Sequence, residues 1–253
     1  MRRREWSTVA GAVLAAVVLG ATAHQLSWSA PSEPERAAPA EVLGAVLDAE
    51  LPADGLAAVE RRARAAVLAV EVDACGSRRR ASATLVEGLG GTARVITNVH
   101  VVQGAASVQL SDETRGQRRG SAEVDGRWPG RDLAELDADR AAELASRALP
   151  VGEDPRVGDR VVVVGHPGGR ATAEAGVVRS IEPRSTGGVT SPAVVVAVPA
   201  SGGHSGGAVV DAQGRLVAIV AARDPRTGEA VAHPVSALGA ARVAVPASCG
   251  PGD

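Results

Sequence analysis

Several residue types are scarce or missing in this chain of 253 residues. Phe and Tyr are absent, and three Trp are its only aromatic side chains. Platforms that stack on single-stranded nucleic acid need aromatic faces, so the sequence argues against such a binder. The 27 basic and 29 acidic side chains nearly balance, which excludes a polybasic nucleic-acid binder and an acidic disordered tail as the main character of the chain.

Cysteine is also rare, with Cys75 and Cys249 as the only two. Two cysteines are too few for a disulfide-rich scaffold but can form one bridge in an oxidising compartment, and two buried free thiols are the alternative. Apolar residues make up 45 % of the chain, which is enough for a packed core. The 30 Gly and 15 Pro, together with many Val and Ala, favour short strands and tight turns over a helix bundle.

The N-terminus has the layout of a targeting segment. Three arginines at positions 2–4 precede the apolar stretch Val9–Ala23, and Ala21-Thr22-Ala23 has the spacing of a cleavage site. Trp6 and Trp28 bracket a longer stretch without charged residues, as aromatic residues do at the two faces of a membrane. Residues 1–28 are therefore predicted to be a cleaved signal peptide or a single transmembrane anchor. Both readings leave the arginines inside and the rest of the chain outside the cytoplasm.

The remainder divides into a linker and a strand-rich body. Residues 29–64 are predicted to be a Pro- and Ala-rich linker with short helical segments, at 41–50 and 56–66. From about residue 65 onward, short Val, Ile and Ala runs alternate with turn residues, which predicts an antiparallel all-β barrel or sandwich. The eleven expected strands cover residues 67–72, 82–87, 93–97, 107–110, 132–136, 160–164, 173–178, 193–198, 208–210, 215–221 and 230–233. Residues 139–149 have a helical pattern, either in a surface insertion or between two lobes.

Two segments carry residues suited to nucleophilic chemistry. His100 ends the apolar run Val95-Ile96-Thr97-Asn98-Val99-His100, and Ser205 lies within Gly202-Gly203-His204-Ser205-Gly206-Gly207. Glycines let a serine sit in a tight turn that exposes its hydroxyl and directs backbone N–H groups to one point. Acyl transfer needs such a nucleophile beside a cradle for the oxyanion.

A carboxylate is also required to orient the histidine and to stabilise its imidazolium form. Asp132 is the best candidate because it begins an alternating segment, DLAEL, whose leucines can pack inward. Asp125, Asp137 and Asp139 are the nearby alternatives.

The order His100, Asp132, Ser205, with the segments TNVHVV, DLAEL and GHSGGAVV, resembles the trypsin-like serine proteases of the chymotrypsin superfamily. The likeness covers roughly residues 65–249 and is nearest to the HtrA (Deg) type and to the actinobacterial MarP-like periplasmic proteases, which also have cysteines where Cys75 and Cys249 stand. His204 stands where trypsin has a carboxylate, and Ala208 replaces a proline that usually follows the glycine pair. These departures leave every expected catalytic group in place.

The resemblance implies a fold of two six-stranded antiparallel β-barrels, about 65–150 and 151–249, in a protease domain that spans 65–253. It implies His100 as general base, Asp132 as its orienting acid and Ser205 as nucleophile, with the backbone N–H groups of Gly203 and Ser205 forming the oxyanion hole. It also favours a Cys75–Cys249 disulfide. The expected activity is that of an extracytoplasmic serine endopeptidase that acts on proteins or peptides and needs no cofactor and no metal.

Alternatives from other classes remain. A catalytically weak or inactive protease fold would serve as a binding module. The motif GHSGG also matches the nucleophile turn of α/β-hydrolases, with Ser205, Asp224 and His233 in the required order, but that turn must lead into a helix, whereas a Val-rich hairpin pattern follows Ser205. Zinc binding by His100, His166 and His204 lacks the paired ligand spacing of zinc sites.

Overall fold

The computed structural model describes residues 53–112, 117–128, 130–138, 141–186, 189–239 and 242–244. The predicted signal or anchor at 1–28 and Cys249 lie outside the described residues. No helix in the described part of the chain is long and apolar enough to cross a bilayer.

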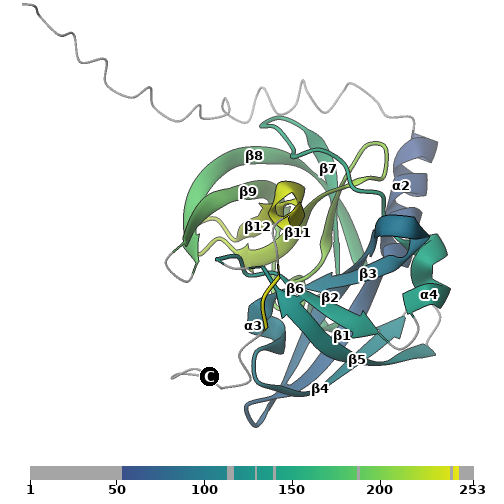
Figure 1. Ribbon diagram of the computed structural model, residues 1–253. Coiled ribbons are helices and arrows are strands. Elements are labelled where there is room, and N and C mark those ends of the chain that lie inside the picture. Colours follow the sequence, from purple (N-terminus) through teal and green to yellow (C-terminus); the bar gives the residue numbers. More distant parts are fainter. Residues whose placement is uncertain are drawn as a thin grey trace, which may run out of the picture. The chain divides into compact units, whose positions relative to one another are not determined.

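The first barrel closes in the strand order β1-β2-β3-β6-β5-β4. Its strands are β1 (Val67–Ala74), β2 (Ser77–Glu87), β3 (Ala93–Thr97), β4 (Ala105–Asp112), β5 (Gln117–Arg127) and β6 (Ala134–Ala138). All neighbouring pairs run antiparallel. Figure 1 shows these strands below the second barrel, with the short helix α3 (Val99–Val102) at one end.

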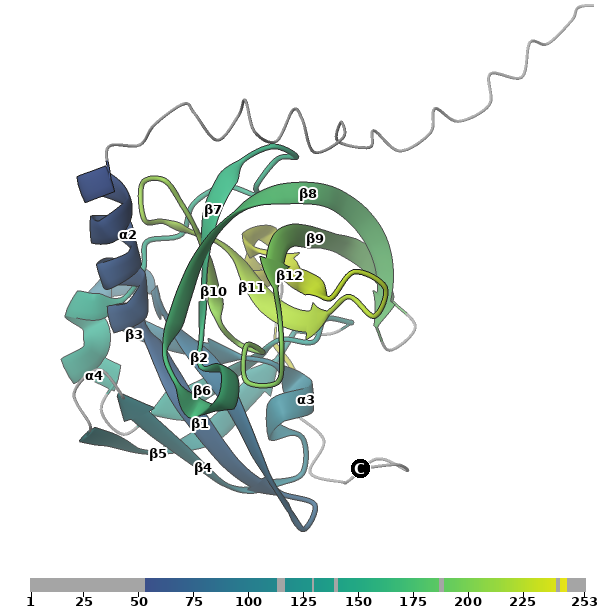
Figure 2. The same cartoon turned by 180° about the vertical axis from the view of Figure 1, so that it is seen from behind.

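The second barrel closes in the order β10-β11-β12-β9-β8-β7. Its strands are β7 (Arg160–Gly165), β8 (Thr172–Thr186), β9 (Val189–Pro199), β10 (Ala208–Asp211), β11 (Leu216–Arg223) and β12 (Glu229–Pro234). The long hairpin β8–β9 curls around this barrel in Figure 2. The all-β prediction with two six-stranded antiparallel barrels is thereby confirmed.

Strand β5 was not expected from the sequence. Its residues QRRGSAEVDGR are mostly polar or charged and lack a sustained apolar alternation. The strand forms because barrel closure supplies hydrogen-bonding partners on both sides, β4 and β6. This pairing uses backbone groups and so does not require apolar side chains in β5. Tertiary context therefore overrides a weak local signal here.

Helical segments connect and cover the barrels. The pattern at 139–149 becomes α4 (Ala141–Leu144) followed by the 3-10 turn η3 (Ala145–Arg147), in the connection between the two barrels. The helix α2 (Ala53–Ala66) lies beside both barrels in Figures 1 and 2. It buries Ala63 and Ala66 completely in a core shared with both barrels, and Arg64 donates a hydrogen bond of 2.8 Å to Ala171 O.

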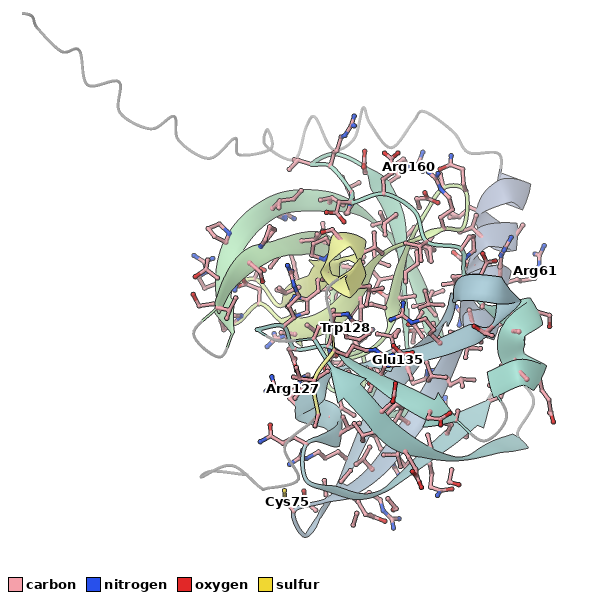
Figure 3. The ribbon with its side chains drawn as sticks, viewed as in Figure 1. Arg61, Cys75, Arg127, Trp128, Glu135 and Arg160 are labelled. Atoms are coloured by element: carbon pink, nitrogen blue, oxygen red, sulfur yellow. The ribbon has the colours of Figure 1, made fainter. Side chains whose placement is uncertain are left out.

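Trp128, the only tryptophan in the described residues, is completely buried just after β5. Its Nε1 donates to Leu238 O at 3.2 Å, and the Arg94 guanidinium lies 5.3 Å from its ring centroid. Leu238 belongs to the turn η5 (Val235–Gly239), which follows β12. The Trp128 side chain therefore connects the first barrel to η5, the segment that follows the last strand of the second barrel. Figure 3 shows Trp128 in the interior near Glu135.

Candidate active site

His100 and Asp132 meet at one end of the first barrel. Asp132 Oδ2 lies 2.5 Å from His100 Nδ1, and Oδ1 accepts a hydrogen bond of 2.9 Å from the backbone N–H of His100. Both carboxylate oxygens thus hold one residue, one through its ring and one through its backbone. This arrangement orients the imidazole with Nδ1 toward the acid, so the other ring nitrogen is left for a reaction partner.

The local backbone explains how these residues meet. Strand β3 ends at Thr97, and His100 follows in α3. The side chain of His100 is half exposed. Asp132 lies in the bend that precedes β6, and β6 is the antiparallel neighbour of β3. From the sequence this strand is expected to begin at Asp132, but it begins two residues later, at Ala134. Asn98 Nδ2 donates to Asp132 O at 2.6 Å and joins the two segments directly. The sequence placed Asn98 beside His100 but gave no indication of this role.

The competing carboxylates have other surroundings. Asp125 pairs with Arg242, and Asp137 lies exposed on β6 opposite Glu123 of β5. Asp139 lies outside the described residues. Among the described carboxylates, Asp132 alone is hydrogen-bonded to the His100 ring.

Ser205 lies in the loop between β9 and β10, which packs against both β11 and the first barrel. Its Oγ donates to Ala221 O at 3.3 Å, and the hydrogen bonds of the described residues do not join it to His100. The loop is fixed on β11 by Gly206 N donating to Val220 O at 2.8 Å and by Val220 N donating to Gly207 O at 2.9 Å. It is fixed on β2 by Ser82 N, which donates to Ser205 O at 2.8 Å.

The peptide planes on either side of this loop are oriented by their carbonyls. Gly202 O accepts from Gly168 N at 3.4 Å, and His204 O accepts from Gly207 N at 2.8 Å. Because the C=O and N–H of a trans peptide point in opposite directions, the N–H groups of Gly203 and Ser205 face away from these partners. Neither N–H has an acceptor among the described residues. Two such donors without partners, in the same loop as a serine hydroxyl, are groups of the kind that can bind an oxyanion.

Gly203 owes its conformation to the absence of a side chain. Its φ is +106°, and a Cβ at this position would lie 2.3 Å from His166 O and 2.9 Å from Pro167 Cα. The contacting backbone belongs to His166 and to the turn η4 (Pro167–Gly169). The glycine thus allows the loop that carries Gly203 to lie directly on η4.

Two further histidines lie buried near the site. Burial lowers the pKa of His166 to about 4, with Arg64 and His204 acting in the same direction and Asp112 opposing them. Burial also lowers the pKa of His233 on β12, with Asp132 opposing the shift and Arg131 and His100 reinforcing it. Nδ1 of each has no hydrogen-bond partner within the described residues. His204 is buried as well, and its Nδ1 accepts from Ser201 N at 3.1 Å.

Small buried residues lie where β9 ends and in β12 beside it. Ala200 and Ala230 are buried, and Ala200 N donates to Gly228 O at 2.9 Å. Glu229, at the start of β12, pairs with Arg179, with Arg179 Nη2 at 2.6 Å from Glu229 Oε1.

Comparison with known proteins agrees with the fold. The family model described as "Trypsin-like peptidase domain" matches residues 81–219, more than half of the chain. The chain belongs to this family. The matched range includes His100, Asp132 and Ser205.

The curated relatives of this trypsin-like peptidase include a periplasmic and a chloroplastic protease. The chain is 35 % identical to the periplasmic serine endoprotease DegP of Salmonella typhimurium over 130 residues, which are 49 % of this chain and 26 % of DegP. It is 33 % identical to the chloroplastic Protease Do-like 1 of Arabidopsis thaliana over 134 residues, 49 % of this chain and 29 % of that protein. The matched part therefore spans less than a third of either relative.

Solved structures of the same architecture include two further proteases. The active form of the Rv3671c protease from M. tuberculosis superposes with a TM-score of 0.61 at 23 % identity, covering 81 % of this chain and 85 % of that chain. The HtrA-type protease AlgW with a tripeptide gives a TM-score of 0.60 at 27 % identity, covering 72 % of this chain and 61 % of that chain.

The α/β-hydrolase alternative does not fit the structure. Ser205 leads into β10 of a closed antiparallel barrel and not into a helix. Asp224 is held by Arg184 at 2.5 Å. The described residues also contain no group of three or more His, Cys, Asp or Glu side chains placed to hold a metal ion.

Proposed function

We propose that this protein is a serine endopeptidase that acts outside the cytoplasm on proteins or peptides. The observation that carries the proposal is the pairing of His100 with both oxygens of Asp132, together with two N–H groups without acceptors beside Ser205. A base held in one orientation and a pair of donors flanking a hydroxyl are the two components of acyl transfer.

The reaction begins when the Ser205 hydroxyl turns from Ala221 O toward Nε2 of His100. His100 accepts the hydroxyl proton while Oγ bonds to the substrate carbonyl carbon, and the Gly203 and Ser205 N–H groups bind the resulting oxyanion. His100 then gives the proton to the departing amine, which leaves an acyl-enzyme. Water, deprotonated by His100, releases the acyl group and restores Ser205. Asp132 stabilises the imidazolium throughout and gains no proton.

A fluorophosphonate probe tests the nucleophile in the purified full chain. The probe should label the wild-type chain and leave Ser205→Ala unlabelled, with unchanged folding as judged by circular dichroism. Labelling that persists in Ser205→Ala would remove Ser205 from this role.

The alternative of a catalytically weak or inactive binding module has one observation in its favour, the engagement of the Ser205 hydroxyl with Ala221 O. Casein hydrolysis separates the two functions. The wild-type chain should degrade unfolded casein, and His100→Ala should not. Equal casein binding by both proteins with no cleavage by either would favour the binding module.

The compartment and the disulfide belong to the same proposal. DegP is named as periplasmic, and the predicted segment 1–28 would direct or anchor the chain there.

Cys75 lies at the tip of the β1–β2 hairpin in Figure 3, with a φ of +51°, and the described residues include no free cysteine. A Cys75–Cys249 bridge predicts that thiol titration in denaturant without reductant, on protein recovered from outside the cytoplasm, detects no free thiol. Two thiols per chain would contradict the bridge.

A further inference from the structure

Strand β2 of the first barrel holds three carbonyls of the loop that carries Ser205. Ser82 Oγ donates to Gly203 O at 2.7 Å, and Ser82 N donates to Ser205 O at 2.8 Å. Thr84 Oγ1 donates to Gly206 O at 2.8 Å. Both β2 residues are completely buried, more than 100 residues away from the loop in sequence.

The Ser82 hydroxyl also holds the neighbouring turn. It accepts a hydrogen bond of 2.9 Å from the backbone N–H of His166, the residue before η4. From η4, Gly168 N donates to Gly202 O. One hydroxyl therefore connects the loop of Gly203 to the turn that orients the peptide preceding Gly203. A serine hydroxyl can donate once and accept at the same time, which is what this position demands and what alanine lacks.

Every peptide plane from 202 to 207 then has a partner for its carbonyl. Gly168 N holds the plane 202–203, Ser82 Oγ holds 203–204 and Gly207 N holds 204–205. Ser82 N holds 205–206, and Thr84 Oγ1 holds 206–207. Since a trans peptide fixes its N–H opposite its C=O, the Gly168 and Gly207 contacts set where the N–H groups of Gly203 and Ser205 point. The Ser82 and Thr84 contacts hold the planes between and after these two.

We propose that Ser82 is a positioning residue for the oxyanion hole, with Thr84 in a supporting role. Neither residue is assigned any contact with substrate. Ser82 acts by keeping the Gly203 and Ser205 donors preorganised before a tetrahedral intermediate forms, so that no reorganisation is needed during the reaction. This inference rests on the proposed peptidase function.

The effect should appear in kcat and in the binding of tetrahedral adducts. In Ser82→Ala, kcat for a peptide amide substrate should fall ~10- to 100-fold while KM stays within about threefold, a smaller loss than the ~10²–10³-fold change seen when an oxyanion donor is removed outright. Affinity for a peptidyl boronic acid, which forms a tetrahedral adduct on Ser205, should fall by a similar factor. Ser82→Thr retains the hydroxyl and should stay within about threefold of wild type in both measurements.

Thr97→Val is the matched control, because Thr97 Oγ1 donates to Ser82 O at 2.8 Å and holds no carbonyl of the Ser205 loop. It loses one buried hydrogen bond between β3 and β2, so its melting temperature should fall while kcat stays within about threefold of wild type. If Ser82→Ala cannot be recovered folded, Thr84→Val carries the test, with an expected loss of ~3- to 10-fold in kcat and a parallel loss of boronate affinity.

Three results would overturn the assignment: a folded Ser82→Ala with kcat within threefold of wild type, a kcat loss without a matching loss of boronate affinity, or a folded Ser82→Thr as impaired as Ser82→Ala. If Ser82→Ala does not fold, an unchanged kcat in Thr84→Val would likewise overturn the assignment. A wild-type chain that neither cleaves peptide nor reacts with fluorophosphonate would instead refute the proposed function itself.

Discussion

Gly203→Ala provides a direct test of the oxyanion geometry, because the structure determines what the added methyl group meets. The new Cβ would lie 2.3 Å from His166 O, which is backbone and cannot swing aside as a side chain would. The φ of +106° also lies in a region essentially restricted to glycine, where other residues are strained by ~1–3 kcal/mol. Relief requires either that η4 move away or that the 202–203 peptide rotate, and both displace the Gly203 N–H.

Loss of one oxyanion donor typically costs about 2.7–4 kcal/mol of transition-state stabilisation, a factor of ~10²–10³ in rate. We therefore expect kcat/KM of Gly203→Ala, measured on a peptide amide substrate, to fall by about that factor. The neighbouring Gly202 is the control, because a Cβ there meets nothing within 4 Å. Gly202→Ala should stay within about threefold of wild type. The reasoning fails if folded Gly203→Ala keeps activity within threefold, or if both alanine variants lose activity equally.

Three further predictions concern the acid, a buried histidine and the core. Asp132→Asn should retain the fold and lower kcat ~10⁴-fold, because the amide holds His100 in the wrong tautomer; loss of less than tenfold would argue for another acid. The His166 pKa of about 4 lies below its ordinary value of 6.5. Between pH 4 and pH 6.5 the unfolded chain therefore binds more protons at His166 than the folded chain does. The free energy of unfolding should therefore fall as pH drops from 6.5 to 4, by at most about 3 kcal/mol. His166→Asn should weaken this dependence in urea titrations, and an identical slope in both proteins would contradict the buried neutral imidazole. Trp128→Ala should lower the free energy of unfolding by ~3–5 kcal/mol, measured by the same titrations, while Trp128→Phe, which loses the bond to Leu238 but fills most of the space, should lose less. Equal losses in the two variants would place the stabilisation in the hydrogen bond.

The fold was predictable where the chain repeats a simple local pattern. The apolar runs that became β3, β7 and β11 stand between clear turn residues, so their strands could be located from the sequence. Strand β5 could not be, because its polar residues pair through their backbones and the partners β4 and β6 form only in the closed barrel.

The candidate site likewise contains residues that the sequence predicts and contacts that it does not. His100, Asp132 and Ser205 could be predicted as candidates because their segments combine a recognisable order with chemistry that few other residues supply, and the structure joins His100 to Asp132 directly. The roles of Asn98 and Ser82 were not found. Each acts through a hydrogen bond to the backbone of a distant residue, Asp132 in one case and Gly203 in the other. A backbone acceptor has the same chemistry at every position, so nothing at Asp132 or Gly203 marks it as a partner.

Gly206, which follows Ser205, has a consequence for how the two barrels could diverge. A Cβ on Gly206 would lie 2.0 Å from Ser82 O, and one on Gly207 would lie 2.2 Å from Val164 O. At Gly206 the main chain rests on the main chain of the first barrel, beside the Thr97 hydroxyl, which would lie 2.6 Å from the same Cβ. The Gly207 contact lies within the second barrel. Substitutions elsewhere can reshape the surface of either barrel, but at the contact of Gly206 with Ser82 the two barrels must change together or not at all.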